Sequence, residues 1–304
     1  MTVWLGQRRE MRCPGCRSKG LPDVHAGCAA EPGWQVTKLE EDVMGSATVQ
    51  GQLWGTGPHD WAEVIEPMMR PVHLATLTAL GPLSGLSLLD AGCGAGLALL
   101  LAVEQGARVS GLDASAALLD VARGRLPDAD LRVGDIEELP YDDATFDVVT
   151  AYNSIQYAFD PKTAVAELAR VARPGGRVAI EVWGEAARCE TEVFFARLRE
   201  LAAPPPGTAA PLAVSEPGVV EGLLTAAGLE PYATGEADCP FIFPNLDAGW
   251  RGQCSAGPLQ RVIQLVGAET VREAFDEVHA RYRQPDGSYR QENVFRYVIG
   301  RKPE

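Results

Sequence analysis

Basic residues are scarce in this sequence. Its 27 Lys and Arg stand against 41 Asp and Glu, which leaves a formal net charge of −14 at pH 7. A groove for nucleic acid is normally basic, and so is a docking site on an anionic membrane. We therefore predict no nucleic-acid and no membrane partner, and a small molecule as the preferred ligand.

Long apolar runs are missing as well. The longest, Leu97 to Val103, is far shorter than the ~18–20 residues that span a bilayer. At the N-terminus, MTVWLGQRRE carries its two arginines behind the apolar residues and has no apolar signal core. We expect a soluble, cytoplasmic protein, and nothing in the sequence excludes a homo-oligomer.

Cysteine is neither dense nor paired. Seven cysteines are scattered over 304 residues, whereas secreted disulfide frameworks are short and rich in cysteine. Cys13, Cys16, His25 and Cys28 are spaced as zinc ligands could be. Pro and Gly surround them, however, and no helix or strand pattern holds one pair against the other, so we predict no metal site.

Regular patterning begins only after residue 43. Residues 1–43 have neither the strand nor the helix period and predict an irregular extension. In the predicted domain, 44–304, we expect lid helices in 44–80, a ligand-binding core in 81–183, a substrate and lid region in 184–290 and a last strand in 291–304. From residue 86, short apolar runs alternate with amphipathic stretches, which predicts an α/β fold with a mostly parallel sheet and helices on both faces.

One strand-to-helix turn is rich in glycine. The strand Leu86 to Leu89 runs through DAGCGAG (90–96) into the helix Leu97 to Gln105. Glycines let a ligand approach the backbone, and the helix start offers free N–H groups. The same pattern is also typical of a tight strand-to-helix turn that binds no ligand. A dinucleotide fingerprint needs a glycine where Leu97 stands, which disfavours nicotinamide cofactors.

Polar side chains follow the next strands in order. Asp113 ends the strand from Arg108 and can accept from both hydroxyls of a ribose, or it can cap the next helix, for which Ser115 is the alternative cap. Asp135 follows the third strand, where its carboxylate can accept from an adenine amine while Ile136 covers the ring. Asn153 ends the fourth strand.

These stretches resemble the class I S-adenosylmethionine-dependent methyltransferases, in particular the type-11 group with the ubiquinone and menaquinone methyltransferases. The resemblance rests on LLDAGCGAG (88–96), VSGLDAS (109–115), LRVGDIEELPYDDATFDVV (131–149) and ELARVARPGGRVAIEVW (167–183). It implies a Rossmann-like, seven-stranded sheet with helical lid insertions, whose last, antiparallel strand is Asn293 to Gly300. It also implies S-adenosylmethionine as cofactor and S-adenosylhomocysteine as product.

The resemblance further assigns cofactor contacts. The methionine part falls to the loop of Asp90, Ala91, Gly92, Gly94 and Gly96 together with Asn153, the ribose to Asp113 with Ala114, and the adenine to Asp135 and Ile136. Trp54, or Trp61 in its place, could shield the positive sulfur by a cation–π contact, or both could simply pack against the sheet. The implied activity is methyl transfer to a small organic acceptor such as a secondary metabolite, by in-line displacement, within a biosynthetic route.

The sequence indicates the residues for catalysis and acceptor binding less clearly than those for cofactor binding. The catalytic candidates are His59 and Tyr157, although a structural or solvated role is favoured for each histidine, including His73; we expect positioning to matter more than acid–base chemistry. The acceptor candidates are Gln156, Tyr157, Phe241 and Trp250, although the last two could equally form the core of a lid. Whether O, N or C is methylated stays open, and the alternatives are a dinucleotide-dependent oxidoreductase and a non-catalytic protein with the cofactor fold.

Overall fold

The structure is a computed structural model that describes residues 46–203 and 211–304. The predicted extension 1–43 lies outside the described residues, and so do Cys13, Cys16, His25 and Cys28. Within the described part of the chain, no helix is long and apolar enough to cross a membrane.

A seven-stranded sheet forms the centre of the described domain. Its strands lie in the order β3-β2-β1-β4-β5-β9-β6, and β9 alone among them runs antiparallel to its neighbours. The strands are β1 (Ser87–Ala91), β2 (Arg108–Asp113), β3 (Asp130–Val133), β4 (Phe146–Tyr152), β5 (Ala172–Trp183), β6 (Glu230–Asp238) and β9 (Val294–Arg301). The predicted fold is confirmed, with the last strand one residue later at each end than Asn293 to Gly300.

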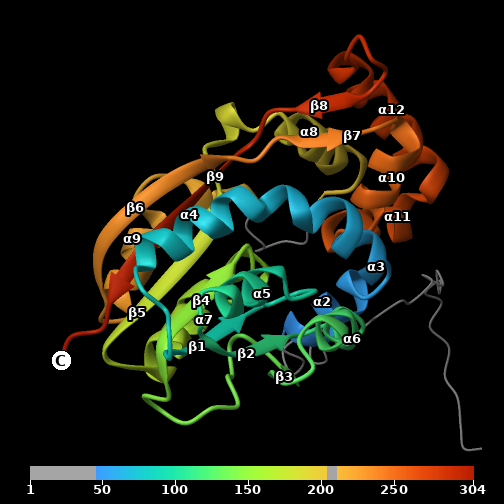
Figure 1. Cartoon of the computed structure of the whole chain (residues 1–304). Helices are drawn as coiled ribbons and strands as arrows, with labels where there is room; N and C mark the ends of the chain where they lie inside the picture. The colour runs from blue at the N-terminus through green and yellow to red at the C-terminus, as the bar shows by residue number, and fades with distance from the viewer. Residues whose placement is uncertain (1–45, 204–210) are drawn as a thin grey trace, which may run out of the picture. The chain divides into compact units, whose positions relative to one another are not determined.

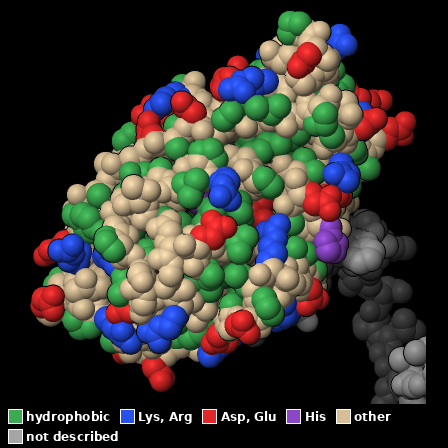
Figure 2. Space-filling view, in the orientation of Figure 1, with side chains coloured by type: hydrophobic (Ala, Val, Ile, Leu, Met, Phe, Trp, Pro, Cys, Tyr) green, Lys and Arg blue, Asp and Glu red, His purple; other side chains and the backbone are tan. Residues whose placement is uncertain are grey.

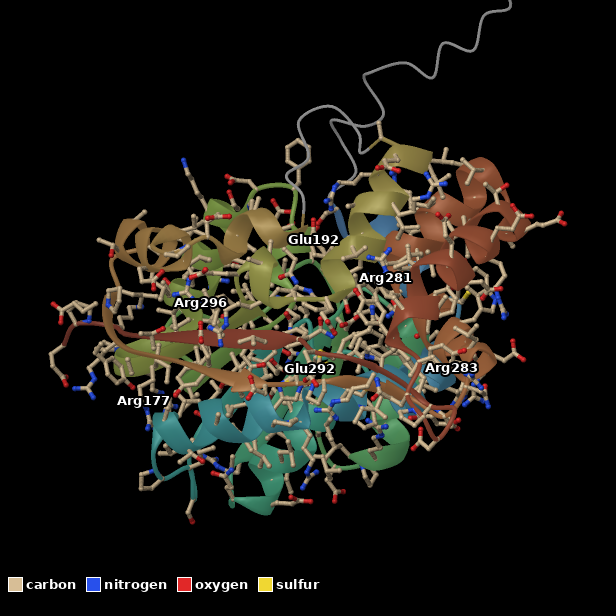
Figure 3. All side chains as sticks on the ribbon, turned by 90° about the horizontal axis from the view of Figure 1, so that it is seen from above. Arg177, Glu192, Arg281, Arg283, Glu292 and Arg296 are labelled. Atoms are coloured by element: carbon tan, nitrogen blue, oxygen red, sulfur yellow. The ribbon has the colours of Figure 1, made fainter. Side chains whose placement is uncertain are left out.

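Helices cover both faces because neighbouring residues of each strand point to opposite sides. Leu88 of β1 packs in one apolar cluster with α4, α5 and α6, whereas Leu89 packs in another with α7 and α9. The helices are α4 (Arg70–Leu80), α5 (Leu97–Glu104), α6 (Ala116–Arg125), α7 (Pro161–Val171) and α9 (Val219–Ala226). Arg177 of β5 donates to the Leu80 carbonyl and so ties the end of α4 to the sheet (Figure 3).

The segment before the sheet is helical almost throughout, but its helix type changes. It comprises α2 (Ser46–Trp54), α3 (Pro58–Asp60), a π-helix η1 (Trp61–Ile65) and a 3₁₀-helix η2 (Glu66–Met69) before α4. Pro67 and Pro71 stand in the first turns of η2 and α4, where the N–H that proline lacks is not needed. These changes in residues per turn alter which side chains face the sheet.

An insertion separates the paired strands β6 and β9. Asp238 pairs with Val294, and the next amide, Cys239 N, donates to Asn293 O at 2.8 Å, so the insertion leaves and returns at one place. It contains β7 (Phe241–Phe243), α10 (Leu246–Cys254), α11 (Gly257–Val266), α12 (Ala268–His279) and β8 (Tyr289–Gln291). Together with α8 (Thr191–Leu201) these elements gather at one end of the domain (Figure 1). On the face drawn in Figure 2, acidic and basic side chains are interspersed.

Candidate functional site

A large cavity opens where β1, β2, β3 and β4 end, in the crevice typical of ligand sites in open α/β sheets. It encloses about 1390 Å³ of empty space, a figure that includes open solvent at its mouth. Carboxylates, glycines and aromatic rings are prominent in its lining. The lining includes Trp54, Trp61, Glu66, Met69, His73, Asp90, Gly92, Gly94, Asp113, Ala114, Asp135, Ile136, Tyr152, Asn153, Ser154, Tyr157, Trp183, Phe195, Phe241 and Phe295.

The glycine loop lies at the floor of this cavity. Gly92 has φ +87°, and a Cβ there would lie 2.3 Å from Cβ of Ser154, so only glycine fits. Ser154 in turn donates to the Ala91 carbonyl at 2.7 Å. Ala91 and Gly96 shape the turn but do not line the cavity, unlike Asp90, Gly92 and Gly94.

Asp113 links the loop to the next strand. Its Oδ2 accepts from Gly94 N and its Oδ1 from Ser115 N, each at 2.8 Å. The cap of α6 is Ser115, whose hydroxyl accepts from Leu118 N, so Asp113 is available to the cavity. Burial raises the pKa of Asp113, against the effect of these two N–H groups.

Asp90, in contrast, is almost completely buried. Its Oδ1 accepts from the hydroxyl of Thr150 at 2.7 Å. Burial raises the pKa of Asp90 to about 7, although Thr150 and the nearby His73 both lower it. This carboxyl group is therefore poised to change its charge near neutral pH.

The start of α5 is occupied by a carboxylate that the sequence patterns did not indicate. Oε1 of Glu66 accepts from Leu97 N at 3.2 Å, and Oε2 pairs with Nη1 of Arg125 at 2.5 Å. Arg125 also donates to the carbonyls of Ala95 and Ala62. Burial raises the pKa of Glu66, and Arg125 lowers it. One of the free N–H groups expected at this helix start, that of Leu97, is therefore already partnered.

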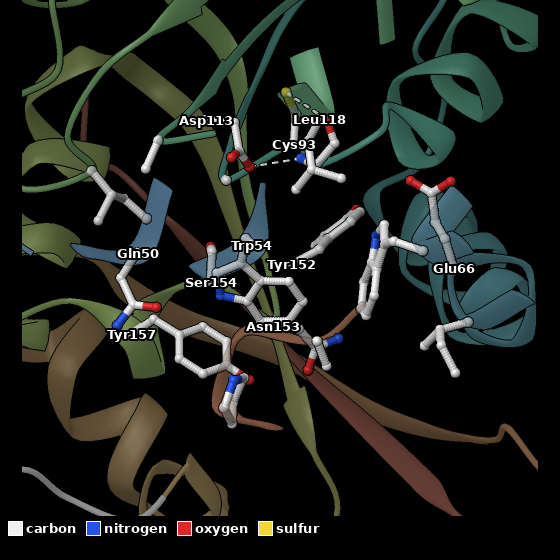
Figure 4. A pocket seen from close by; sticks show the side chains of 18 of the residues that line it. Gln50, Trp54, Glu66, Cys93, Asp113, Leu118, Tyr152, Asn153, Ser154 and Tyr157 are labelled. Atoms are coloured by element: carbon white, nitrogen blue, oxygen red, sulfur yellow. Dashed lines mark hydrogen bonds between the residues drawn. The ribbon is translucent and has the colours of Figure 1, made fainter. Parts of the chain in front are cut away.

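Aromatic and amide side chains form the wall opposite Asp113 (Figure 4). The ring centroid of Trp54 lies 4.9 Å from that of Trp61 and 5.3 Å from that of Tyr157, edge to face in both cases. Asn153, at φ +52°, approaches the Met69 sulfur through Nδ2 at 3.7 Å, while its buried Oδ1 has no partner within the described residues. Ala114, Asp135 and Ile136, which follow β2 and β3, also line the cavity.

Three sequence-predicted residues lie elsewhere. His59 is exposed on α3, outside the cavity, because its turn of helix faces solvent. Gln156 is also absent from the lining; its amide is buried and has no hydrogen-bond partner among the residues that the structure describes. Trp250 packs against Phe275 in the core of the insertion, with ring centroids 5.5 Å apart. Tyr157 and Phe241 do line the cavity.

A buried histidine and a buried glutamate form a pair at the end of the cavity next to α4 and β5, which is its inner end. Nδ1 of His73, on α4, lies 2.7 Å from Oε2 of Glu181, on β5, and the Thr76 hydroxyl lies 2.5 Å from Oε1. The ring of His73 stacks on Tyr152 with centroids 5.1 Å apart. The sequence patterns, which favoured a structural or solvated role for His73, did not indicate this pair. Glu181 was the available signal, since a charged residue within the apolar strand VAIEVW needs a buried partner.

The inner end is otherwise aromatic. Trp183 contacts Phe195, Phe241 and Phe295, with ring centroids 5.5, 5.7 and 4.3 Å away. All four rings line the cavity. Within residues 46–203 and 211–304, no cluster of three or more His, Cys, Asp or Glu is arranged to hold a metal ion.

Known proteins share the part of the chain that builds this site. Residues 89–180 match the type-11 family model described as a methyltransferase domain. The malonyl-[acyl-carrier protein] O-methyltransferase of Serratia marcescens is 45% identical over 92 residues, which cover 30% of this chain and 36% of that protein. The demethylmenaquinone methyltransferase of Renibacterium salmoninarum is 36% identical over 102 residues, 34% of this chain and 43% of that protein. The chain thus spans less than half of the length of these two relatives.

A solved structure extends the likeness beyond the matched segment. Phosphoethanolamine N-methyltransferase 2 of Haemonchus contortus, determined with phosphomonomethylethanolamine and S-adenosylhomocysteine, has a TM-score of 0.55 at 18% identity. The alignment covers 86% of this chain and 61% of that protein. At this identity the match shows a shared fold.

Proposed function

Because the chain contains a class I S-adenosylmethionine-dependent methyltransferase domain of the type-11 group, we propose that it binds S-adenosylmethionine and methylates a small organic acceptor. We also propose that this protein acts in the cytoplasm, with no nucleic-acid or membrane partner, in line with its net charge of −14. That the chain could form a homo-oligomer and that its domain spans 44–304 are predictions as well.

The observation that carries this proposal is the carboxylate at the start of α5. A dinucleotide places its pyrophosphate at this helix end, where free N–H groups receive it. Here Glu66 accepts from Leu97 N, and Asp90 lies in the same cavity lining. Because Glu66 already accepts from Leu97 N, this helix end has one N–H group fewer to offer a pyrophosphate, which favours the methyl donor over a nicotinamide cofactor.

The residues present fit the methyl donor. Asp113 keeps lone pairs for ribose hydroxyls beside its two N–H partners, and the unpartnered Oδ1 of Asn153 can accept from the amino group of the methionine part. Asp135 and Ile136 stand where the adenine is expected. Asp90 adds negative charge near the expected sulfur once the pH exceeds its pKa of about 7.

When bound, S-adenosylmethionine supplies a methyl carbon that its positive sulfur makes electrophilic. The chain contributes enclosure and position: Trp54, Trp61 and Tyr157 wall the cavity and exclude water. Phe241 and the neighbouring rings supply an apolar surface for the acceptor. Holding the acceptor in line with the methyl carbon accounts for much of the acceleration of such a transfer.

Calorimetric titration tests the proposal. We expect S-adenosylhomocysteine to bind and NAD not to bind. Asp113→Asn should weaken S-adenosylhomocysteine about 10- to 100-fold, the range for losing a hydrogen bond to a charged group. Asp120→Asn, on the exposed face of α6, is the matched control and should change nothing. Binding of NAD instead would favour the oxidoreductase, and binding of neither would favour a non-catalytic protein.

A further inference from the structure

We propose that His73, oriented by Glu181, accepts the proton of a hydroxyl group on an aromatic acceptor, so that the methyl group is placed on oxygen. The inference rests on the proposed function and names the substrate class and the proton acceptor of that same site.

The pair is built as a proton acceptor with a fixed orientation. Glu181 is fully buried and His73 is 4% exposed. A carboxylate only accepts hydrogen bonds, so Nδ1, 2.7 Å from Oε2, carries the ring proton and Nε2 keeps its lone pair. Thr76 holds the other carboxylate oxygen, and stacking on Tyr152 fixes the plane of the ring.

Nε2 is the free end of this arrangement. His73 lines the cavity, and the one hydrogen bond of its ring within residues 46–203 and 211–304 is that of Nδ1 with Glu181. An acceptor group bound at the inner end of the cavity is the partner that this nitrogen lacks.

The need for a base points to oxygen. An amine or an electron-rich carbon attacks a methyl donor through its own lone pair or π electrons, whereas a neutral hydroxyl is a weak nucleophile until it loses its proton. In the proposed step the hydroxyl proton passes to Nε2, the acceptor oxygen bonds to the methyl carbon, and the carbon–sulfur electron pair stays on sulfur. His73 is left as an imidazolium beside Glu181, and the other product is the neutral thioether.

The shape of the inner end points to an aromatic ring. Four aromatic rings line this end: Trp183 contacts Phe195 and Phe241 edge to face and Phe295 at a tilt. Such surfaces bind a planar ring by further offset or edge contacts. With His73 at the same end, a phenol-like molecule satisfies both the apolar wall and the free nitrogen.

The charges around His73 set the direction of its pH dependence. Burial by itself lowers the pKa of His73, but the Glu181 carboxylate, with Asp90 and Glu66 nearby, raises it above its ordinary value. The titratable groups around the ring are Glu181 on β5, Asp90 on β1, Glu66 on η2 and Tyr152 on β4, and Cys239, after β6, lies beside the preceding residue, Val72. Since only the neutral ring accepts a proton, kcat should increase as the pH rises through the pKa of His73.

Titration with 4-nitrophenol tests the proton transfer without methyl transfer. The ionised and neutral forms of this probe differ in absorbance, so the ionised fraction is read directly on binding to protein saturated with S-adenosylhomocysteine. We expect the wild-type protein to bind the probe and to increase its ionised fraction, and His73→Gln to lose that increase. The same replacement at the exposed His59 tests the sequence-based alternative and should keep it.

Several outcomes would overturn the inference. They are an unchanged ionised fraction in a folded His73→Gln, failure of the wild-type protein to bind 4-nitrophenol, and preference for 4-nitroaniline over the phenol. If His73→Gln does not fold, Thr76→Val decides: loss of the Glu181 contact should lower the ionised fraction, whereas Thr78→Val, exposed on the same helix, should not. If S-adenosylhomocysteine itself does not bind, the proposed function fails, and the phenol titration without it still tests His73.

A turnover assay completes the test once a phenol is found to be methylated. We expect His73→Gln to lower kcat about 10²- to 10⁴-fold, the usual contribution of a positioned base. Phenols that are already ionised at the assay pH should lose much less. An equal loss for ionised and neutral phenols would mean a structural role and would contradict the inference.

Discussion

Glu66 and Arg125 are 59 residues apart in the chain, yet Oε2 of one lies 2.5 Å from Nη1 of the other. This ion pair joins the helical segment before the sheet to α6. Through Leu97 N and the Ala95 carbonyl it also holds both sides of the turn that leads into α5. The Glu66–Arg125 pair therefore links the helical segment before the sheet to the glycine loop.

Removing Arg125 should destabilise the domain. Arg125→Met leaves the buried Glu66 carboxylate unpaired, and we expect a loss of about 3 kcal/mol in the free energy of unfolding, measured by urea denaturation. Arg123→Met is the matched control, because Arg123 pairs with Asp120 on the exposed face of the same helix; it should cost about 1 kcal/mol or less. Equal losses would mean that the Glu66 pair contributes no more than a surface pair.

Asp90 should make stability depend on pH. The unfolded chain loses this proton near pH 4, whereas the folded chain keeps it up to about pH 7. Stability therefore falls as the pH rises from about 4 to 7, and the full penalty, on the order of 4 kcal/mol at most, is present above pH 7. Asp90→Asn should thus be more stable than the wild-type protein at pH 8 and similar at pH 4 in urea unfolding. A difference that does not vary with pH would contradict this.

Trp54 allows a test of charge recognition. If its ring faces the positive sulfur, Trp54→Leu should weaken S-adenosylmethionine by about 3- to 30-fold more than the uncharged thioether S-adenosylhomocysteine. Calorimetry with both ligands measures the difference. Trp61→Leu, measured in parallel, shows which ring makes the contact. Equal weakening of the two ligands would reduce both rings to a packing role.

Replacing Phe241 and Trp250 in turn should distinguish a side chain that lines the cavity from one that packs in the core of the insertion. Phe241→Ala removes part of the aromatic wall and should lower the affinity for 4-nitrophenol about tenfold, with unchanged binding of S-adenosylhomocysteine. Trp250→Ala should leave the affinity for 4-nitrophenol unchanged and lower the melting temperature, because Trp250 packs on Phe275 away from the cavity. The reverse pattern would restore Trp250 as an acceptor contact.

The sequence predicted the parts of this site that depend on local patterns. DAGCGAG (90–96), Asp113 and Asp135 each follow a strand, and parallel strands bring such ends to one edge of the sheet. The His73 pair with Glu181 depends on packing between residues 108 positions apart, which no local period records. His59 and His73 lie on one helical segment, but the π- and 3₁₀-turns between them shift its angular phase, so periodicity could not show which histidine faces inward.

The pairing of Asp238 with Val294 makes the insertion between β6 and β9 an exchangeable part of the domain. Since the 239–293 segment enters and leaves between adjacent residues of one strand pair, a segment of another length can replace it while every pairing of the seven-stranded sheet is kept. Shuffling this cassette among homologous enzymes would exchange Phe241 and the helices around the inner end of the cavity together. A chimeric protein made in this way would keep the turns that hold Asp90, Asp113 and Asp135.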